Sequence, residues 1–353
     1  MERQKVLFIG GLGRSGSTLV EKLLNEQPGM VSAGETIHLW ERGLRDQERC
    51  GCGEAFGSCP HWAAIGQSGF GGWEYVDVDE AIDLRWSVDR SRRLPQIFSS
   101  LVNNRLAPEQ ARYLKYLVPV LHSVGAHNPA LGTAPSDNGN EPTAKHRPVV
   151  IESSKHLSTA ALLALDPSLD VRVLHLIRDP RGVAYSWTKE VARPETDDEN
   201  MPTYHPLRTA GRWVTDNLGF EALGRFVPMQ RLRYEDFLTD PTGHLRSIST
   251  FAGVDEASIN LDFLVDNTAT LTAPMHSVAG NPMRFGRSTI TLKLDDEWKT
   301  NLDPKQARLV AAATAPLLAR YGYPITTELY NPAVPSNQLE NGEHQSVAPP
   351  AIT

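Results

Sequence analysis

The sequence lacks the features that would assign it to several specialised protein classes. No apolar run approaches the length needed to span a membrane, and the first residues are charged rather than a signal-like apolar stretch. We therefore expect a soluble, cytoplasmic protein without a transmembrane segment. Its 3 cysteines all lie between Cys50 and Cys59, which is too few for a disulfide framework in 353 residues.

The chain also lacks an excess of positive charge. Its 35 lysines and arginines are outnumbered by 42 aspartates and glutamates, giving a formal net charge of −7. General binding of nucleic acid requires a basic surface against the phosphate backbone, so the composition argues against a nucleic-acid partner. Any anion-binding site must therefore be formed by a few residues close together rather than by a broad basic surface. The length fits a single domain over residues 1–325, and the composition of residues 326–353 predicts a disordered tail.

The most informative stretch lies near the N-terminus, where a strand, a glycine-rich loop and a helix are predicted in succession. The apolar run Val6 to Ile9 predicts a buried strand, and the apolar spacing from Leu19 to Leu24 predicts a helix capped by Ser17 or Thr18. Between them, glycines free the backbone to turn its N–H groups towards an anion at the helix N-terminus. These glycines are Gly10, Gly11, Gly13 and Gly16.

This stretch is compatible with more than one kind of ligand. Gly11 to Gly16 satisfies the dinucleotide pattern G-x-G-x-x-G, with Glu35 near the place of a ribose-binding acid. Gly11 to Thr18 also has the frame of a P-loop, but Ser17 replaces the P-loop lysine. A plain turn would need neither Arg14 nor so many glycines. Arg14 between glycines favours a grip on a terminal phosphate or sulfate.

Strand and helix patterns alternate along the rest of the chain. This alternation predicts an α/β fold, with a central parallel β-sheet flanked by helices. A helical insertion is expected over residues 77–124, followed by a flexible loop to residue 147. Further strands are predicted at Met30–Ala33, Asp170–Ile177 and Met229–Tyr234, and within Pro148–His156, where the strand ends in polar residues.

Polar side chains follow three of these strands directly. Glu35 follows the second strand, Lys155 the third and Arg178 the fourth, and Ser186 stands two helical turns beyond Arg178. Because the carboxyl ends of parallel strands meet at one edge of a sheet, these residues should face the same crevice as the glycine loop. Asp179 is expected to cap the helix that begins at Pro180.

A compact group of cysteines and a histidine precedes the helical insertion. Cys50, Cys52, Cys59 and His61 could form a closed structural zinc site. Their spacing differs from the usual paired C-x2-C knuckles, however, and so favours a glycine-rich loop with buried or redox-labile thiols.

The glycine loop, taken together with Leu176 to Ser186, resembles the sulfotransferases that use 3′-phosphoadenosine 5′-phosphosulfate (PAPS). The resemblance implies their P-loop-like fold, PAPS as co-substrate, release of adenosine 3′,5′-bisphosphate (PAP), and no required metal. It assigns Arg178 and Ser186 to the 3′-phosphate and Tyr234 to the adenine. Residues 283–287 with 296–299 resemble the closing segment of the family, which adds Arg284, Phe285 and Gly286 to the 3′-phosphate end. The residues assigned to the 5′-phosphosulfate are Gly13, Arg14, Ser15, Gly16, Ser17 and Thr18.

Within this family, Arg14 and the run Gly34-Glu35-Thr36 look most similar to the tyrosylprotein and carbohydrate branch. That similarity implies Glu35 as general base and Lys155, with Arg14, as catalytic cations. The chain lacks an arginine just after Thr36, where the tyrosylprotein enzymes bind a peptide, so we expect a carbohydrate, glycolipid or other small hydroxyl acceptor. Two alternatives remain, a P-loop-like small-molecule kinase and a non-catalytic nucleotide-binding protein.

Overall fold

A computed structural model describes residues 2–127, 147–193, 200–285 and 289–325. The expected flexible loop before residue 147 and the expected tail at 326–353 lie almost wholly outside these ranges. The central element is a parallel sheet of five strands in the order β2-β3-β1-β4-β5, which confirms the predicted α/β fold. Its strands are β1 (Gln4–Gly10), β2 (Met30–Gly34), β3 (Val149–Lys155), β4 (Leu169–Ile177) and β5 (Met229–Arg233).

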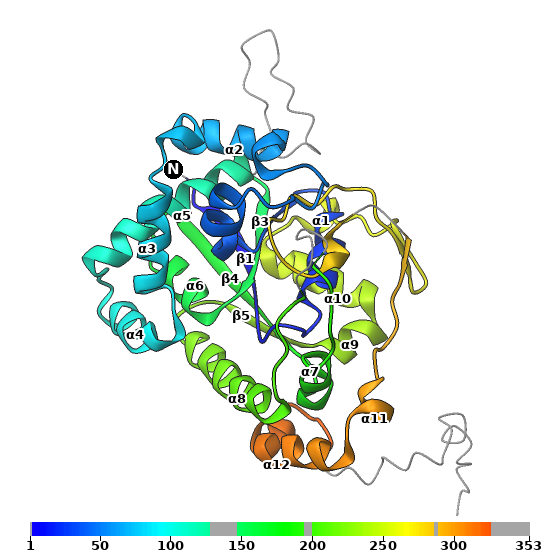
Figure 1. Cartoon of the computed structure of the whole chain (residues 1–353). Coiled ribbons are helices and arrows are strands. Elements are labelled where there is room, and N and C mark those ends of the chain that lie inside the picture. Colours follow the sequence, from blue (N-terminus) through cyan, green and yellow to red (C-terminus); the bar gives the residue numbers. More distant parts are fainter. Residues whose placement is uncertain (1, 128–146, 194–199, 286–288, 326–353) are drawn as a thin grey trace, which may run out of the picture.

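Alternating side chains of β1 enter two separate cores, one on each face of the sheet. Val6 and Phe8 pack into the core shared with the insertion helices, whereas Leu7 and Ile9 pack into the core formed with the helices of the opposite face. All four side chains are at most 1% exposed, so β1 is the buried centre of the molecule. Figure 1 shows helices α3 to α6 on one side of the sheet, and α1, α9 and α10 on the other.

Helices surround the sheet as the periodicity predicts. The helical insertion is present, and its last helix, α5, packs directly on β1, β2 and β3. Helix α1 begins at Ser17, but its N-cap is Gly16 rather than the expected Ser17 or Thr18. The helices are α1 (Ser17–Asn25), α2 (Pro60–Phe70), α3 (Val78–Val88), α4 (Leu94–Asn103), α5 (Pro108–Ala126), α6 (Leu157–Leu163), α7 (Pro180–Ser186), α8 (Pro206–Leu223), α9 (Tyr234–Thr239), α10 (Pro241–Ala252), α11 (Trp298–Asn301) and α12 (Pro304–Arg320).

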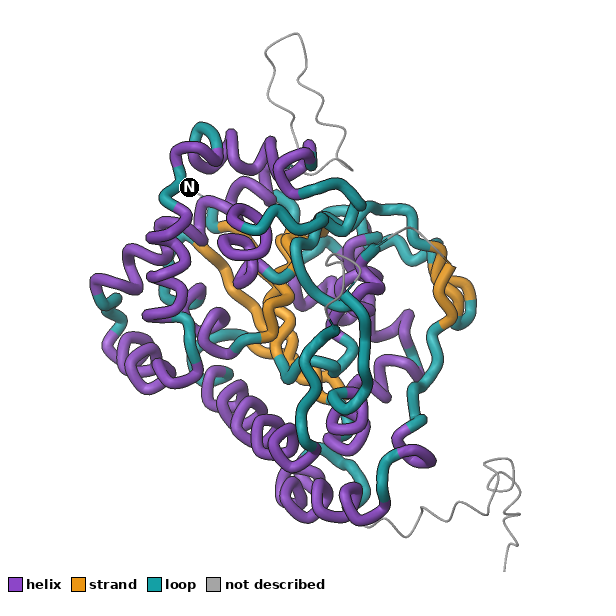
Figure 2. Tube along the Cα trace, in the orientation of Figure 1, coloured by secondary structure: helices purple, strands orange, loops and turns teal. Residues whose placement is uncertain are grey.

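A second, small sheet was not predicted from the sequence. Its antiparallel strands are β6 (Leu264–Val265), β7 (Thr268–Thr270) and β8 (Thr289–Thr291), which Figure 2 shows at a distance from the central sheet. Strands of two or three residues are too short to give an alternating pattern. In the part of the chain that the structure describes, no helix combines the length and the apolar character required to cross a bilayer.

Candidate active site

A cavity of about 680 Å³ opens at the carboxyl edge of the parallel sheet. Its walls include residues that follow all five strands, because the ends of parallel strands meet there. Most of the site residues predicted from the sequence line it, and Ser15 lies buried within the loop. The predicted residues in the walls are Gly13, Arg14, Gly16, Ser17, Thr18, Glu35, Lys155, Arg178, Ser186 and Tyr234.

The glycine loop turns at the N-terminus of α1, against the ring of Tyr234. Gly16 has a φ of +91°, and a Cβ at this position would lie 2.2 Å from Cε2 of Tyr234, so only glycine fits. Arg14 also has a positive φ, of 73°. A left-handed arginine is uncommon and is found mostly where the surrounding structure enforces it, often at functional sites.

The side chain of Arg14 lies within the cavity among sulfur and aromatic groups. Its Nη2 lies 3.2 Å from Sδ of Met201, and its guanidinium lies 5.2 Å from the ring centre of Trp187. Burial lowers the pKa of Arg14, and the charge of Glu35 partly offsets this. An arginine remains charged in proteins, so Arg14 supplies a partly desolvated cation.

Glu35, just after β2, and Lys155, at the end of β3, face the same cavity as expected, and there they form an ion pair. Nζ of Lys155 lies 2.5 Å from Oε1 of Glu35 and also donates to the carbonyl of Ser153 at 3.0 Å. The pairing of β1 with β3 shifts register just before Lys155, whose φ is 66°.

The other carboxylate oxygen of Glu35, Oε2, lies 3.8 Å from Nε2 of His38. Desolvation and the nearby Arg42 hold the pKa of His38 well below its usual value, so the ring is neutral.

Glu152, which the sequence analysis did not single out, holds the backbone next to Glu35. This fully buried carboxylate on β3 accepts hydrogen bonds from the backbone N–H of Thr36 at 3.1 Å, from its hydroxyl at 2.7 Å, and from both the N–H and the hydroxyl of Ser154. Burial raises the pKa of Glu152 to about 7. The available signal was a glutamate directly after the apolar run Val149–Ile151.

A second buried carboxylate, Glu21 on α1, joins the helix to β2 and β3. It accepts hydrogen bonds from the hydroxyl of Ser32 and, at 2.7 Å, from the hydroxyl of Ser153. Burial raises the pKa of Glu21 to about 7 as well. Together with Glu152, it fixes the strand ends that carry Glu35 and Lys155.

Arg178 joins the two strand–loop–helix units at the other end of the cavity. One guanidinium nitrogen donates to the carbonyl of Arg14 at 3.1 Å, and another donates to the carbonyl and carboxylate of Asp295, both at 3.0 Å. Ser186 ends the short helix α7, which Asp179 caps by accepting from the N–H of Arg181 at 2.9 Å. An anion bound by Arg178 would therefore compete with Asp295.

The predicted closing segment differs from expectation at Arg284. This arginine is 1% exposed and does not line the cavity; it donates to the carbonyls of Gly280 at 3.0 Å and Arg49 at 3.4 Å. Its segment turns at Pro282–Arg284, which folds the guanidinium back on the segment's own backbone. Phe285 lies beside it, 4.3 Å from guanidinium carbon to ring centre, and Gly286 lies outside the described residues.

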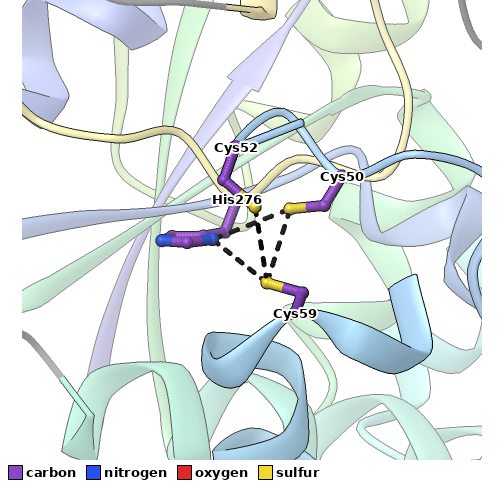
Figure 3. Close-up of side chains that lie close together, drawn as sticks. All are labelled: Cys50, Cys52, Cys59 and His276. Carbon is purple, nitrogen blue, oxygen red and sulfur yellow. Dashed lines mark hydrogen bonds between the residues drawn. The ribbon is translucent and has the colours of Figure 1, made fainter. Parts of the chain in front are cut away.

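The cysteines lie together, but with a different histidine from the one expected. Nδ1 of His276 lies 3.3 Å from Sγ of Cys59 and 3.6 Å from Sγ of Cys50, and Cys52 completes the group (Figure 3). His61 belongs to α2, and its ring stacks on that of His276 with 4.3 Å between ring centres. The prediction of His61 as the fourth member is therefore wrong, because this ring packs behind His276.

Aromatic and basic side chains that the sequence analysis did not select form the remaining wall. Trp187 and Tyr204 lie with ring centres 4.8 Å apart. Trp187 follows Ser186 directly, so its place in the second phosphate motif could have identified it. Arg42 and Arg193 share the carboxylate of Glu48, at 2.6 and 2.9 Å. The other basic members of this wall are His38, His156, Arg208, Arg212 and Lys293.

Comparison with known proteins gives the family. The human carbohydrate sulfotransferase 3 is 26% identical over 181 residues, a match covering 47% of this chain and 36% of that protein. The mouse carbohydrate sulfotransferase 5 is 23% identical over 192 residues, a match covering 48% of this chain and 44% of that protein. The matches thus span less than half of these relatives. Among solved structures, the sulfotransferase domain of the Synechococcus olefin synthase is 22% identical with a TM-score of 0.45, covering 92% of this chain and 97% of that one. The family model for the sulfotransferase family matches residues 7–258, well over half of the chain, which therefore belongs to this family.

Proposed function

We propose that this chain transfers a sulfuryl group from PAPS to a hydroxyl group of an acceptor and releases PAP. The observation that carries the proposal is that one cavity is lined by the glycine loop, by the Glu35–Lys155 pair and by Arg178 with Ser186. A phosphate grip, a paired carboxylate and a second cationic site are the three parts that such a transfer needs. Membership of the sulfotransferase family supports the same chemistry.

The two anion-binding parts suit a nucleotide with phosphates at both ends of one ribose. The N–H groups at the start of α1 and the cation of Arg14 suit the 5′-phosphosulfate. Arg178 and the Ser186 hydroxyl suit the 3′-phosphate, since guanidinium and hydroxyl donors both bind phosphate oxygens. The hydrogen bond from Arg178 to the carbonyl of Arg14 brings the two anion-binding parts next to each other. Tyr234, which packs against Gly16, lies where it can support the nucleotide.

In the proposed step, Glu35 acts as general base. Its carboxylate takes the proton of the acceptor hydroxyl, whose oxygen forms a bond to sulfur while the bond between sulfur and the 5′-phosphate oxygen breaks. The electron pair of that bond stays on PAP, where Arg14, Lys155 and the loop N–H groups stabilise the growing charge. Because these groups supply the positive charge, the step needs no metal ion.

We propose a carbohydrate, or another small acceptor with several polar groups, for the open end of the cavity. Trp187 and Tyr204 offer flat apolar surfaces to a sugar ring, and the neighbouring histidines and arginines offer hydrogen bonds. The two curated relatives described above carry carbohydrate sulfotransferase names, which supports this choice.

The test is to incubate the purified chain with PAPS and a panel of carbohydrates and glycolipids. We expect mass spectrometry to find an acceptor heavier by one sulfuryl group, with an equal amount of PAP, and at least about 100-fold slower product formation with E35Q. Phosphorylated products from ATP and Mg²⁺, with none sulfated, would establish the kinase alternative. PAP binding without any sulfated product, even from a whole-cell extract, would favour a non-catalytic nucleotide-binding protein.

A further inference from the structure

A group of three cysteines and one histidine lies outside the proposed catalytic cavity. Cys50, Cys52 and Cys59 come from one loop, whereas His276 comes from a segment more than 200 residues later in the chain. Their ligand atoms all lie within 4.8 Å of one another, and Figure 3 shows the three sulfurs and the imidazole converging on one point. We infer that this group is a structural zinc site with three thiolates and the Nδ1 atom of His276 as ligands.

Four of the six distances between the ligand atoms match the tetrahedron that zinc imposes, and the other two are at most 4.8 Å. Zinc binds sulfur at about 2.3 Å and imidazole nitrogen at about 2.0–2.1 Å, so sulfur atoms should lie about 3.8 Å apart and sulfur and nitrogen about 3.5 Å apart. Sγ of Cys59 lies 3.7 Å from Sγ of Cys50 and 3.7 Å from Sγ of Cys52. Nδ1 of His276 lies 3.6 and 3.3 Å from Cys50 and Cys59. A disulfide requires about 2.05 Å, so no pair of these sulfurs is bonded.

The surroundings support a closed site rather than a catalytic one. Cys50 and Cys59 are fully buried, His276 is partly buried, and Cys52 lies at the exposed edge of the group. Cys59 is the N-cap of the 11-residue helix α2, an end that favours a thiolate. The ring of His61 stacks on the ring of His276, with an angle of 11° between the two planes, and so holds the His276 ring in place. Four protein ligands leave no open position for substrate.

The backbone already joins the two segments that the zinc would bind. The N–H of Gly51 donates to the carbonyl of Ser277 at 2.9 Å, directly beside His276. Residues 49 and 55 form an antiparallel bridge, so the first two cysteines are presented by a tight loop. The site therefore needs little rearrangement to accept an ion.

The proposed zinc site would affect the segment 275–285, which we call the strap. Gly280 of the strap lines the proposed active-site cavity, and a Cβ there would lie 2.8 Å from Oε1 of Glu35. Further along, the carbonyl of Met283 accepts from Nζ of Lys22 at 2.7 Å. Zinc at His276 would thus fix the start of a segment that closes over Glu35. The zinc ion would hold the strap in place and take no part in the reaction. The zinc site could therefore exist whichever group the enzyme transfers.

The test begins with elemental analysis of the wild-type chain, purified without a histidine tag, supplied with Zn²⁺ and then dialysed. We expect about one zinc per chain, and zinc X-ray absorption with about three sulfur neighbours at 2.3 Å and one nitrogen at 2.0–2.1 Å. These measurements need no variant and so do not depend on a variant's folding. Less than about a tenth of an equivalent of zinc, another metal in its place, or a Cys52–Cys59 disulfide in the isolated protein would overturn the assignment.

Two matched variants identify the histidine. H276F removes the proposed ligand and H61F removes the neighbouring ring nitrogens, while both keep an aromatic ring at the stacked position. We expect H276F to retain less than about a fifth of the wild-type zinc and H61F to retain nearly all of it, with a lower melting temperature for H276F. Equal zinc contents in the two variants would contradict the role of His276.

Discussion

Two regions that are built in different ways form and support the proposed active site. The carboxyl edge of the parallel sheet supplies the charged groups, Arg14, Glu35, Lys155 and Arg178, each within a few residues of a strand end. The strap and the cysteine loop supply mainly backbone and packing, through contacts such as that of Cys59 with His276, 217 residues apart. In the proposed reaction, the sheet edge carries the chemistry, and the strap with the cysteine loop holds it in position. Changes in the first should therefore alter single steps of the reaction.

The largest effect is expected at Glu35. In E35Q the amide cannot take the acceptor proton, so turnover should fall by about 10²–10⁴-fold while the affinity for PAP stays close to that of the wild type. The measurement is steady-state formation of the sulfated product together with calorimetric titration of PAP. E54Q, a change in the exposed part of the cysteine loop, serves as control and should keep full turnover. Near-normal turnover of E35Q would remove Glu35 from the role of base.

The second effect concerns binding rather than turnover. R178A removes a guanidinium proposed to bind the 3′-phosphate, so calorimetry should show PAP binding roughly 10- to 100-fold more weakly. Affinity for adenosine 5′-phosphosulfate, which has no 3′-phosphate, should change far less. R92A changes an exposed arginine of the insertion and should leave both affinities unaltered. An equal loss for the two nucleotides would contradict a dedicated 3′-phosphate site.

The third effect is a pH dependence of stability that comes from Glu152. Because burial raises the pKa of this carboxyl to about 7 from an ordinary 4.5, the folded protein binds more protons than the unfolded chain between these values. This group therefore lowers stability as the pH rises from about 4.5 to about 7. Since the amide introduced by E152Q does not titrate, the stability of this variant relative to wild type should rise over that window by on the order of 1–3 kcal/mol.

Denaturant unfolding of both proteins at several pH values measures this difference. Buried histidines titrate in both proteins and cancel in the comparison, including His61 and His175, whose pKa values burial lowers to about 3 and about 4. A difference in stability that does not change with pH would show that the Glu152 carboxyl ionises normally.

The smallest effect is expected from the acid that pairs with Arg178. D295N removes a carboxylate whose side chain is 39% exposed, and such a pair contributes at most about 1 kcal/mol. PAP should bind roughly two- to fivefold more tightly, because the phosphate no longer competes with Asp295. The neighbouring D296N is the matched control, since Asp296 pairs with Lys299 at 3.3 Å instead. Weaker binding by D295N would mean that Asp295 positions Arg178 rather than competing for it.

The same two regions explain how much could be predicted from the sequence. The strands of the parallel sheet and the clustering of Glu35, Lys155 and Arg178 followed from local patterns, because each polar residue directly follows an apolar run and parallel strands share one edge. The positive φ of Arg14 and Lys155 did not follow, since local propensity disfavours it and the tertiary structure imposes it.

What was missed depends on contacts between distant segments. The histidine considered as a partner of the cysteines was His61, two residues after Cys59, but the fold brings His276 there instead. The assignment of Arg284 to the nucleotide stays a prediction, because in this structure its guanidinium donates to the carbonyl of Gly280 and does not line the cavity. Glu152 was not predicted, because the sequence shows only a glutamate at the end of an apolar run, and the four donors whose hydrogen bonds it accepts come together only in the fold.

The central claim, that the cavity binds PAPS as sulfuryl donor, is tested most directly by calorimetric titration of the wild-type chain with nucleotides. PAP, ADP with Mg²⁺ and NAD are compared under the same conditions. The account predicts that PAP binds at least about tenfold more tightly than the other two, because only PAP presents phosphates to both the glycine loop and Arg178. Tighter binding of ADP with Mg²⁺, or of NAD, would contradict it.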